Sequence, residues 1–311
     1  MKFKGTAKYQ VKNIFEMSGM LMFGQSRHEA KNAAKANGAQ GPTEYAHMTG
    51  IHSHNTYRSY FNTCATLLHY AADVHGIKKA NQLTPEHIRE FLLSKSDVKL
   101  ATFRRYSAAL TKLDAALSRL LDRPPQWAET LKEFREAAPV ALDSEQPARA
   151  YLNPSALVGQ IDAGMKLVAE LQWRAGLRVS EACTIKPHQL KGMTNALNGK
   201  QVGLLEIKGK GGKVRIVPVP IEIYSNLQNR LEHETLMINP ATYRACLRLA
   251  AHRSGQEYAG RGTHGLRWCY AQERMDDLIR ENVAYEVALT TVSKLMGHER
   301  AGITCLYLRK G

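Results

Sequence analysis

Residues 295–311 read LMGHERAGITCLYLRKG and place a tyrosine beside the basic end of the chain. His298 follows a glycine in this stretch, and Tyr307 lies nine residues further along. A tyrosine is a weak nucleophile at neutral pH because its pKa is about 10. Cations and a histidine close to the phenol favour the phenolate. A reactive Tyr307 would therefore need basic partners from other parts of the chain.

Three earlier segments supply candidate partners. They read GLRVSE at 176–181, GKGGK at 209–213 and HGLR at 264–267. The GKGGK segment joins two short extended pieces and is predicted to be the tip of a β-hairpin. It is not a phosphate-binding P-loop, because no Ser or Thr follows the lysine and no helix follows the loop.

These residue types suit the transfer of a phosphoryl group on DNA. Arginine carries a planar fork of donors that stays protonated, so Arg178 and Arg267 can clamp the non-bridging oxygens of a phosphodiester. Such pre-placed charge usually supplies the largest part of the rate enhancement. Lys210 at the hairpin tip can protonate the leaving deoxyribose oxygen as a general acid. Tyr307 would attack phosphorus and hold the DNA covalently.

The two histidines complete the candidate set. His264 lies three residues before Arg267, so a helix places both side chains on one face. His298 is expected to hydrogen-bond the phosphate or to support the nucleophile. Each of these residues alone has an ordinary structural explanation, such as a capping histidine, a salt-bridged arginine or a packed tyrosine. The prediction depends on the whole set in this order.

At these residues the chain resembles the tyrosine site-specific recombinases, the phage-integrase family. The resemblance covers residues 150–311 and makes Arg178, Lys210, His264, Arg267, His298 and Tyr307 the catalytic set. Glu181 matches an acidic position that supports the first arginine. The implied reaction forms a 3′-phosphotyrosine, exchanges strands through a Holliday junction and requires neither a metal nor another cofactor. The implied assembly is a tetramer on two double-stranded DNA sites, with a directionality factor as a further partner.

The resemblance also implies a fold. It is mainly α, with a small antiparallel β-sheet or hairpin in the catalytic domain, and it forms a two-domain DNA clamp. We expect a basic N-terminal arm over 1–50, a helical core-binding (SAM-like) domain over 51–138, a linker over 139–150 and a catalytic domain over 151–311. Apolar residues at helical spacing between 53 and 122 support the second of these regions.

Three features depart from the family pattern. The segment between Arg267 and His298 is longer than in compact members, with the additional residues near 276–290. Only four residues follow Tyr307, so the N-terminal arm or the 276–290 segment would have to provide subunit contacts. Trp268 follows the second arginine, where the family frequently has another histidine.

Composition favours a polyanionic partner. The 311 residues carry a formal charge of +15, with 21 Lys and Arg against 14 Asp and Glu in residues 1–150 and 22 against 14 in the rest. Both halves are therefore expected to face the same anion. Five scattered cysteines indicate neither a disulfide framework nor a zinc finger. No signal peptide and no membrane-spanning run is visible, so we expect a cytoplasmic protein at the bacterial nucleoid.

Several basic residues outside the catalytic set are candidates for DNA contacts. Those beside Tyr and Thr on the predicted helix near 102–117 suit phosphate groups, although a solvated helix face explains them equally well. The set is Lys99, Arg104, Arg105, Lys112, Lys208 and Lys213.

Two other functions remain open from the sequence. A type IB topoisomerase-like enzyme shares the tyrosine and its basic partners but relaxes DNA without exchanging strands between sites. A non-catalytic architectural protein could keep the fold and bind DNA alone. The chain length, the Leu-Met-Gly-His sequence and the helical pattern favour recombination, for a mobile element.

Overall fold

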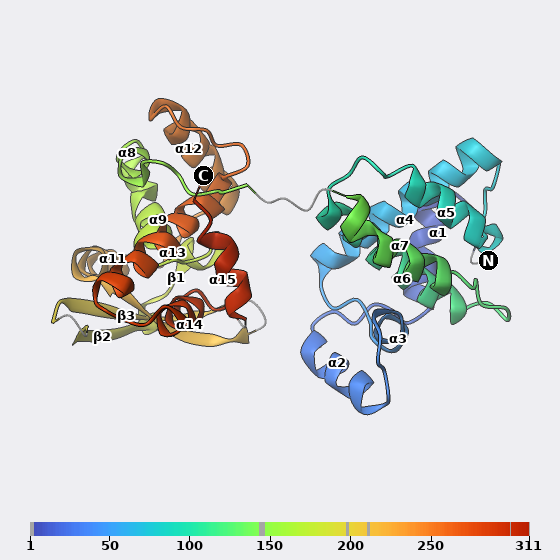
Figure 1. Ribbon diagram of the computed structural model, residues 1–311, viewed down its shortest axis with the longest axis horizontal. Coiled ribbons are helices and arrows are strands. Elements are labelled where there is room, and N and C mark those ends of the chain that lie inside the picture. The colour runs from blue at the N-terminus through green and yellow to red at the C-terminus, as the bar shows by residue number, and fades with distance from the viewer. Residues whose placement is uncertain (1–2, 143–146, 197–198, 210–211, 299, 311) are drawn as a thin grey trace. The chain divides into compact units, whose positions relative to one another are not determined.

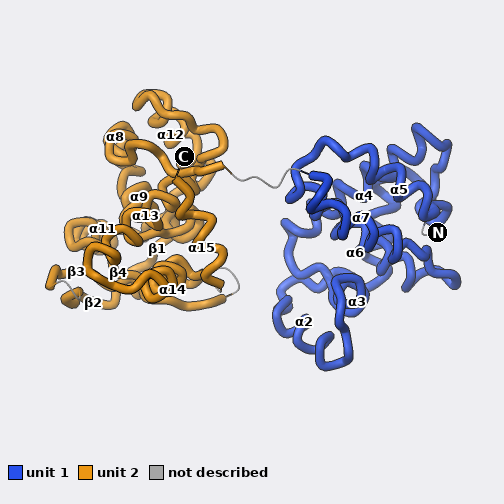
Figure 2. The backbone as a smooth tube through the Cα atoms, viewed as in Figure 1, with its two compact units in different colours: residues 1–145 blue, residues 146–311 orange. Residues whose placement is uncertain are grey.

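The computed structural model describes residues 3–142, 147–196, 199–209, 212–298 and 300–310. The chain forms two compact units, residues 1–145 and residues 146–311 (Figure 2). In the described ranges, no helix is both long enough and apolar enough to cross a membrane.

The first unit is helical. Its elements are α1 (Ala7–Met17), α2 (Arg27–Ala36), α3 (Pro42–Met48), α4 (His54–His75), the 3₁₀ turn η1 (Ala80–Gln82), α5 (Pro85–Leu93), α6 (Leu100–Ser118) and α7 (Ala128–Ala141). The sequence explains several of these boundaries. Thr84 and Pro85 begin α5, and Gly76 ends α4 with a φ of 68°, a left-handed conformation that favours glycine.

The core of this unit includes the N-terminal residues. Val11, Ile14 and Phe15 of α1 are completely buried in the same apolar cluster as α4, α5 and α6. The predicted arm over 1–50 is therefore part of the first unit. At the other end, α7 continues through Pro139 to Ala141 and so enters the predicted linker.

The second unit combines helices with two small sheets (Figure 1). Its helical elements are α8 (Pro154–Gly159), α9 (Ala163–Arg174), α10 (Val179–Ala182), η2 (Pro187–Gln189), α11 (Ile221–His233), α12 (Pro240–Arg253), α13 (Gly262–Arg280), α14 (Tyr285–Leu295) and α15 (Ala301–Tyr307). The strands are β1 (Thr184–Ile185), β2 (Leu190–Asn195), β3 (Gln201–Lys208), β4 (Val214–Pro220) and β5 (Leu236–Met237). This arrangement confirms the predicted fold class, mainly α with a small antiparallel sheet.

The three-stranded sheet holds the predicted hairpin. β3 and β4 pair antiparallel from Val202 opposite Pro220 to Lys208 opposite Val214, and β2 adds a third strand beside β3. β2 was not predicted, because four of its six residues are polar or glycine and five of the six are exposed. The inward residues of β4, Val217 and Val219, are completely buried.

The start of the second unit contains a break that the sequence pattern does not show. Leu157, Ile161 and Met165 recur at helical spacing, but the structure divides the segment into α8 and α9 around Ile161. Ile161 packs in the core although it lies between the two helices. The spacing of the apolar residues therefore continues across the break and does not reveal it. The additional residues predicted near 276–290 form the end of α13 and the start of α14.

Candidate active site

The end of α14 is the point at which the predicted residues meet. Gly297 has a φ of +66° and ends the helix in a left-handed conformation. The last carbonyls of a helix have no partners inside it. Here three arginines donate to them: Arg215 to Leu295 O, Arg267 to Met296 O and Arg178 to Gly297 O. Because the helix ends at the glycine of the Leu-Met-Gly-His sequence, its last carbonyls are available to accept hydrogen bonds. Three guanidinium groups donate to them next to His298.

Arg178 stands at the start of α10. Gly176 precedes it with a φ of +65°, and a side chain there would meet the ring of Tyr270 at 2.4 Å. Arg178 Nη1 donates to Glu181 Oε1 at 2.9 Å, and its backbone N–H donates to Glu181 Oε2 at 2.8 Å. Its side chain stays 27% exposed, so the guanidinium can still face a ligand.

Arg215 on β4 is a member of the site that the sequence analysis missed. Its two terminal nitrogens donate to Glu181, at 3.1 Å to Oε1 and 2.7 Å to Oε2. Burial alone would raise the pKa of Glu181, but the hydrogen bonds from Arg215 and Arg178 lower it to about 2. Glu181 is therefore an anion shared by two cations, and it fixes Arg178 relative to β4.

Replacing Arg215 with methionine is expected to destabilise the second unit by up to about 3 kcal/mol, since it removes one partner of a buried ion pair. Thermal or urea unfolding measures this change. Lys191→Met is the matched control, because its ion pair with Glu206 is 41% and 34% exposed. Equal effects of the two substitutions would contradict the proposed importance of the buried pair.

Arg267 is buried inside α13, with 1% of its surface exposed. Nη1 donates to Gly176 O, and Nη2 donates to Met296 O and contacts His298 Nε2 at 3.3 Å. Burial and the charge of Arg178 lower its pKa to about 10, so it remains a cation at neutral pH. The Arg267 guanidinium thus links the turn at Gly176 to the end of α14 through hydrogen bonds.

Tyr307 lies between two rings. Its ring centroid is 5.1 Å from that of His298 and 5.1 Å from that of Trp268. Gln272 on α13 donates to Tyr307 O at 3.1 Å and holds the end of α15. Trp268, the residue where a histidine was expected, is buried and packs against the candidate nucleophile.

His298 is neutral at physiological pH. Burial and the charges of Arg267, Arg178 and Arg215 lower its pKa from 6.5 to about 4. The same two influences, burial followed by the charge of Arg267, also lower the pKa of His264, which lies one turn before Arg267 on α13. The structure thus places His264 in the electrostatic neighbourhood of the cluster.

The depressed pKa of His298 predicts how stability changes with acid. Between pH 6.5 and about 4 the unfolded chain binds a proton at this ring and the folded chain does not. The free energy of unfolding of the second unit should therefore fall as the pH falls through this range. Urea unfolding of the wild type and His298→Asn measures it, and the variant should show a shallower fall. Parallel curves would contradict the assigned pKa.

Lys210 lies outside the described residues. The preceding residue, Gly209, begins the turn with its N–H bonded to Lys213 O at 2.7 Å. A side chain at Gly209 would meet Arg215 Nη1 at 3.1 Å, Glu181 Oε1 at 3.3 Å and Arg178 Nη1 at 3.5 Å. The first residue of the hairpin turn thus lies directly against the side chains of Arg178, Glu181 and Arg215.

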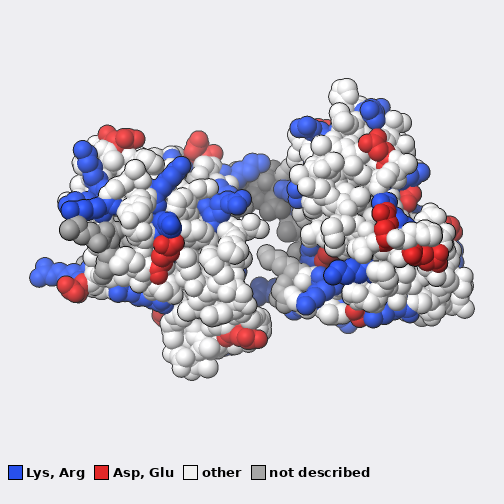
Figure 3. Space-filling model, turned by 180° about the vertical axis from the view of Figure 1, so that it is seen from behind, with Lys and Arg blue, Asp and Glu red and all other residues white. Residues whose placement is uncertain are grey.

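The predicted DNA-binding residues differ in exposure. Lys99, Arg104 and Arg105 are exposed at and near the start of α6, and Lys208 and Lys213 are exposed beside the hairpin turn. Lys and Arg side chains occur on both units in the view of Figure 3. These five side chains are therefore accessible to a ligand.

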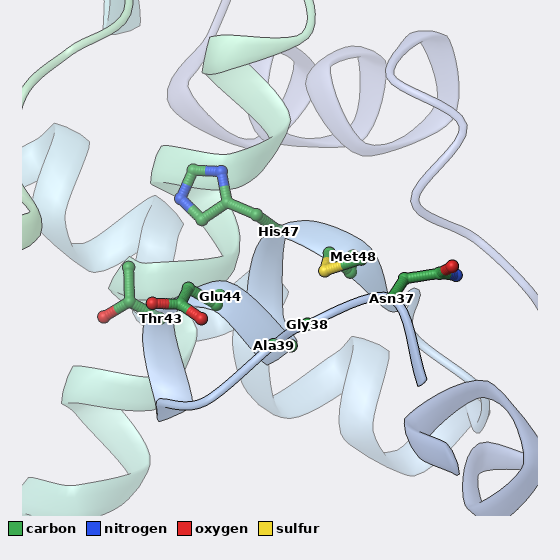
Figure 4. A pocket seen from close by; sticks show the side chains of 7 residues that line it. All are labelled: Asn37, Gly38, Ala39, Thr43, Glu44, His47 and Met48. Atoms are coloured by element: carbon green, nitrogen blue, oxygen red, sulfur yellow. The ribbon is translucent and has the colours of Figure 1, made fainter. Parts of the chain in front are cut away.

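The prediction for Lys112 was wrong. Only 6% of this residue is exposed, and its ammonium donates to Ala46 O, Thr49 O and Thr49 Oγ1. It attaches α3 to α6. A hollow of about 370 Å³ is lined by residues of α3 and of the segment before it, among them Gly38 and His47 (Figure 4). Helical spacing cannot reveal the burial of Lys112, because α3 comes from the part of the sequence with the weakest pattern.

Lys112 predicts a second pH dependence. Burial and the charges of Arg119 and Arg27 lower its pKa from 10.5 to about 7. Between these values only the unfolded chain holds the proton, so the first unit should gain on the order of a few kcal/mol of stability as pH rises from 7 to 10.5. Urea unfolding should show this gain in the wild type and not in Lys112→Met. A gain of the same size in both would refute the assignment.

Comparison with solved structures shows a common fold. The XerH site-specific recombinase bound to palindromic difH, in a post-cleavage complex, superposes with a TM-score of 0.65 at 16% identity, over 100% of this chain and 95% of that one. XerH in a pre-cleavage complex with difH gives 0.61 at 16% identity, over 97% and 93%. No protein-family model and no curated protein sequence matches the chain.

Proposed function

We propose that this chain, which has the fold of the tyrosine site-specific recombinases, cuts and rejoins double-stranded DNA with Tyr307 as nucleophile. The observation that supports it most is the convergence at the end of α14. Arg178 and Arg267 donate to consecutive carbonyls there, and His298 and Tyr307 follow with ring centroids 5.1 Å apart. Residues far apart in sequence thus form one basic site around one phenol.

The chemistry follows from these groups. Phosphodiester cleavage places additional charge on the non-bridging oxygens, and preorganised arginines stabilise it. Arg178 offers a partly exposed fork for those oxygens, while Arg267 supplies charge from a buried position. The Tyr307 oxygen attacks phosphorus, and the bond from phosphorus to the leaving deoxyribose oxygen breaks. Lys210 donates the proton to that oxygen, and the resulting 3′-phosphotyrosine stores the bond energy for rejoining.

The proposed partner is DNA on both units. The five exposed candidates on α6 and beside the hairpin turn contact phosphates, and a homotetramer assembles on two recombination sites of a mobile element. Phosphate contacts release counterions, so log K for binding should fall linearly with log salt, with a slope of about −0.9 for each neutralised phosphate.

The test is a search for a covalent complex. Wild-type protein is incubated in EDTA with nicked duplexes that together span the DNA flanking the gene, and products are separated in SDS. We expect a protein–DNA adduct on particular fragments, and its position gives the site. Exchange between two such fragments supports recombination, whereas relaxation of any supercoiled plasmid without exchange supports the topoisomerase reading. Tight binding to a defined fragment without any adduct would overturn the proposal and favour an architectural protein.

A further inference from the structure

A chain of buried polar side chains runs from the candidate nucleophile helix to the second arginine. Ser293 Oγ and Thr304 Oγ1 are 2.6 Å apart, and Thr304 Oγ1 is 2.9 Å from His298 Nδ1. His298 Nε2 lies 3.3 Å from Arg267 Nη2. Thr304 is completely buried and Ser293 is 5% exposed. Polar groups at such positions need hydrogen-bond partners, and here each hydroxyl has one.

The directions of the two hydrogen bonds made by His298 follow from the arginine. A guanidinium has five donors and no acceptor, so Arg267 must donate and His298 Nε2 must accept. A neutral imidazole that accepts at Nε2 carries its proton on Nδ1. That proton points to Thr304 Oγ1, which accepts it. A hydroxyl has two acceptor lone pairs, so the bond between Thr304 Oγ1 and Ser293 Oγ can run in either direction while Thr304 still accepts from Nδ1.

This arrangement fixes two things at once. It holds the His298 ring in one tautomer, with Nδ1 occupied, so any proton that the ring takes up must bind Nε2. It also fixes α15, because Thr304 lies one turn before Tyr307 on that helix. A valine has nearly the same shape and volume, so the hydroxyl is the part of Thr304 that the packing does not explain.

We propose that Thr304 is a positioning residue that sets the tautomer of His298 and orients α15, so that the ring beside Tyr307 carries its proton on Nδ1 and directs the lone pair of Nε2 toward Arg267. The role in strand cleavage rests on the proposed function. The tautomer itself is a property of the folded protein and needs no DNA. Thr304 touches neither the phosphate nor the reacting oxygen in this account, and it acts through His298.

The test compares Thr304→Val, which keeps the shape and loses the acceptor, with Thr304→Ser, which keeps the hydroxyl. Nitrogen-15 NMR of the histidine side chains at neutral pH identifies which nitrogen of His298 carries the proton, with His298→Asn used for assignment. We expect the Nδ1–H form in the wild type and in Thr304→Ser. The Val variant should lose it or mix it with the Nε2–H form.

The second readout is the rate of adduct formation at saturating protein. Loss of one hydrogen bond to a group in the site should slow Thr304→Val on the order of tenfold, and Thr304→Ser should recover most of the rate. Ser293→Ala serves as a milder variant, since it removes the last link but leaves Thr304 as acceptor, and it should keep the Nδ1–H form.

The outcomes separate this inference from the proposed function. An Nε2–H signal for His298 in the wild type, or the Nδ1–H form persisting unchanged in Thr304→Val, would overturn the role of Thr304. A further outcome is that the protein keeps the Nδ1–H form only when residue 304 has a hydroxyl and yet never forms an adduct. That result would support the hydrogen-bond chain and count against Tyr307 as the nucleophile.

Discussion

Tyr307→Phe should form no covalent complex with DNA, although it should bind the same fragments with an affinity within about twofold of the wild type. The phenyl ring can still pack between His298 and Trp268, because both contacts are made by the ring. Only the hydroxyl that attacks phosphorus is lost. Adducts are measured in SDS after incubation with the nicked fragments, and binding is measured by gel shift.

The matched control is Tyr285→Phe. Tyr285 lies on α14 in the same unit and is 53% exposed. It should form adducts at the wild-type rate. An adduct of normal yield with Tyr307→Phe would eliminate Tyr307 as the nucleophile, and loss of both adduct and binding in that variant would point to a structural role.

Arg267→Lys should slow adduct formation by about 10² to 10³, the usual cost of losing one preorganised group that stabilises developing negative charge. The guanidinium joins Gly176 O to Met296 O and also reaches His298, whereas a lysine has a single ammonium that cannot span these positions. The charge is retained but its placement is lost. Single-turnover cleavage gives the rate, and gel shift should show binding reduced by no more than a few fold.

Arg280→Lys provides the control, because Arg280 ends the same helix with its side chain 74% exposed. A further variant of the substrate sharpens the test. A neutral methylphosphonate at the mapped cleavage position needs less positive charge, so it should narrow the difference between wild type and Arg267→Lys. A rate for Arg267→Lys close to that of the wild type would show that this arginine does not act on the phosphate.

The sequence predicts the parts of the site that are set locally. His264 and Arg267 lie one turn apart because a helix was expected there, and Arg178 begins a helix because Gly176 turns the chain before it. The β3–β4 hairpin follows from two apolar segments around a glycine-rich tip. In each case, the necessary information lies within a few neighbouring residues.

Arg215 was missed although the sequence carried a signal. Side chains alternate along a strand, so Arg215 shares a face with Val217 and Val219, which are both buried. A charged residue on the buried face needs a partner of opposite charge. Its partner, Glu181, is 34 positions away, and pairing them requires the tertiary fold. Thr304 was missed for the same reason, because its role depends on contacts with His298 and Ser293 that only the folded chain makes.

Lys112 illustrates the opposite failure. Its place among basic residues on α6 predicted a surface that faces DNA. In the structure α3 covers that face, and backbone oxygens of Ala46 and Thr49 take up the ammonium. Nothing in the sequence of α6 indicates that a segment more than 60 positions upstream lies against it.

Mass spectrometry can identify the residue that carries the DNA. The adduct from wild-type protein is digested with nuclease and trypsin, and the remaining peptides are analysed by mass spectrometry. Cleavage after Arg300 and Arg309 releases the peptide AGITCLYLR, whose one tyrosine is Tyr307. We expect a nucleotide remnant on Tyr307 within this peptide. A remnant on any other residue would contradict the assignment of Tyr307 as the nucleophile.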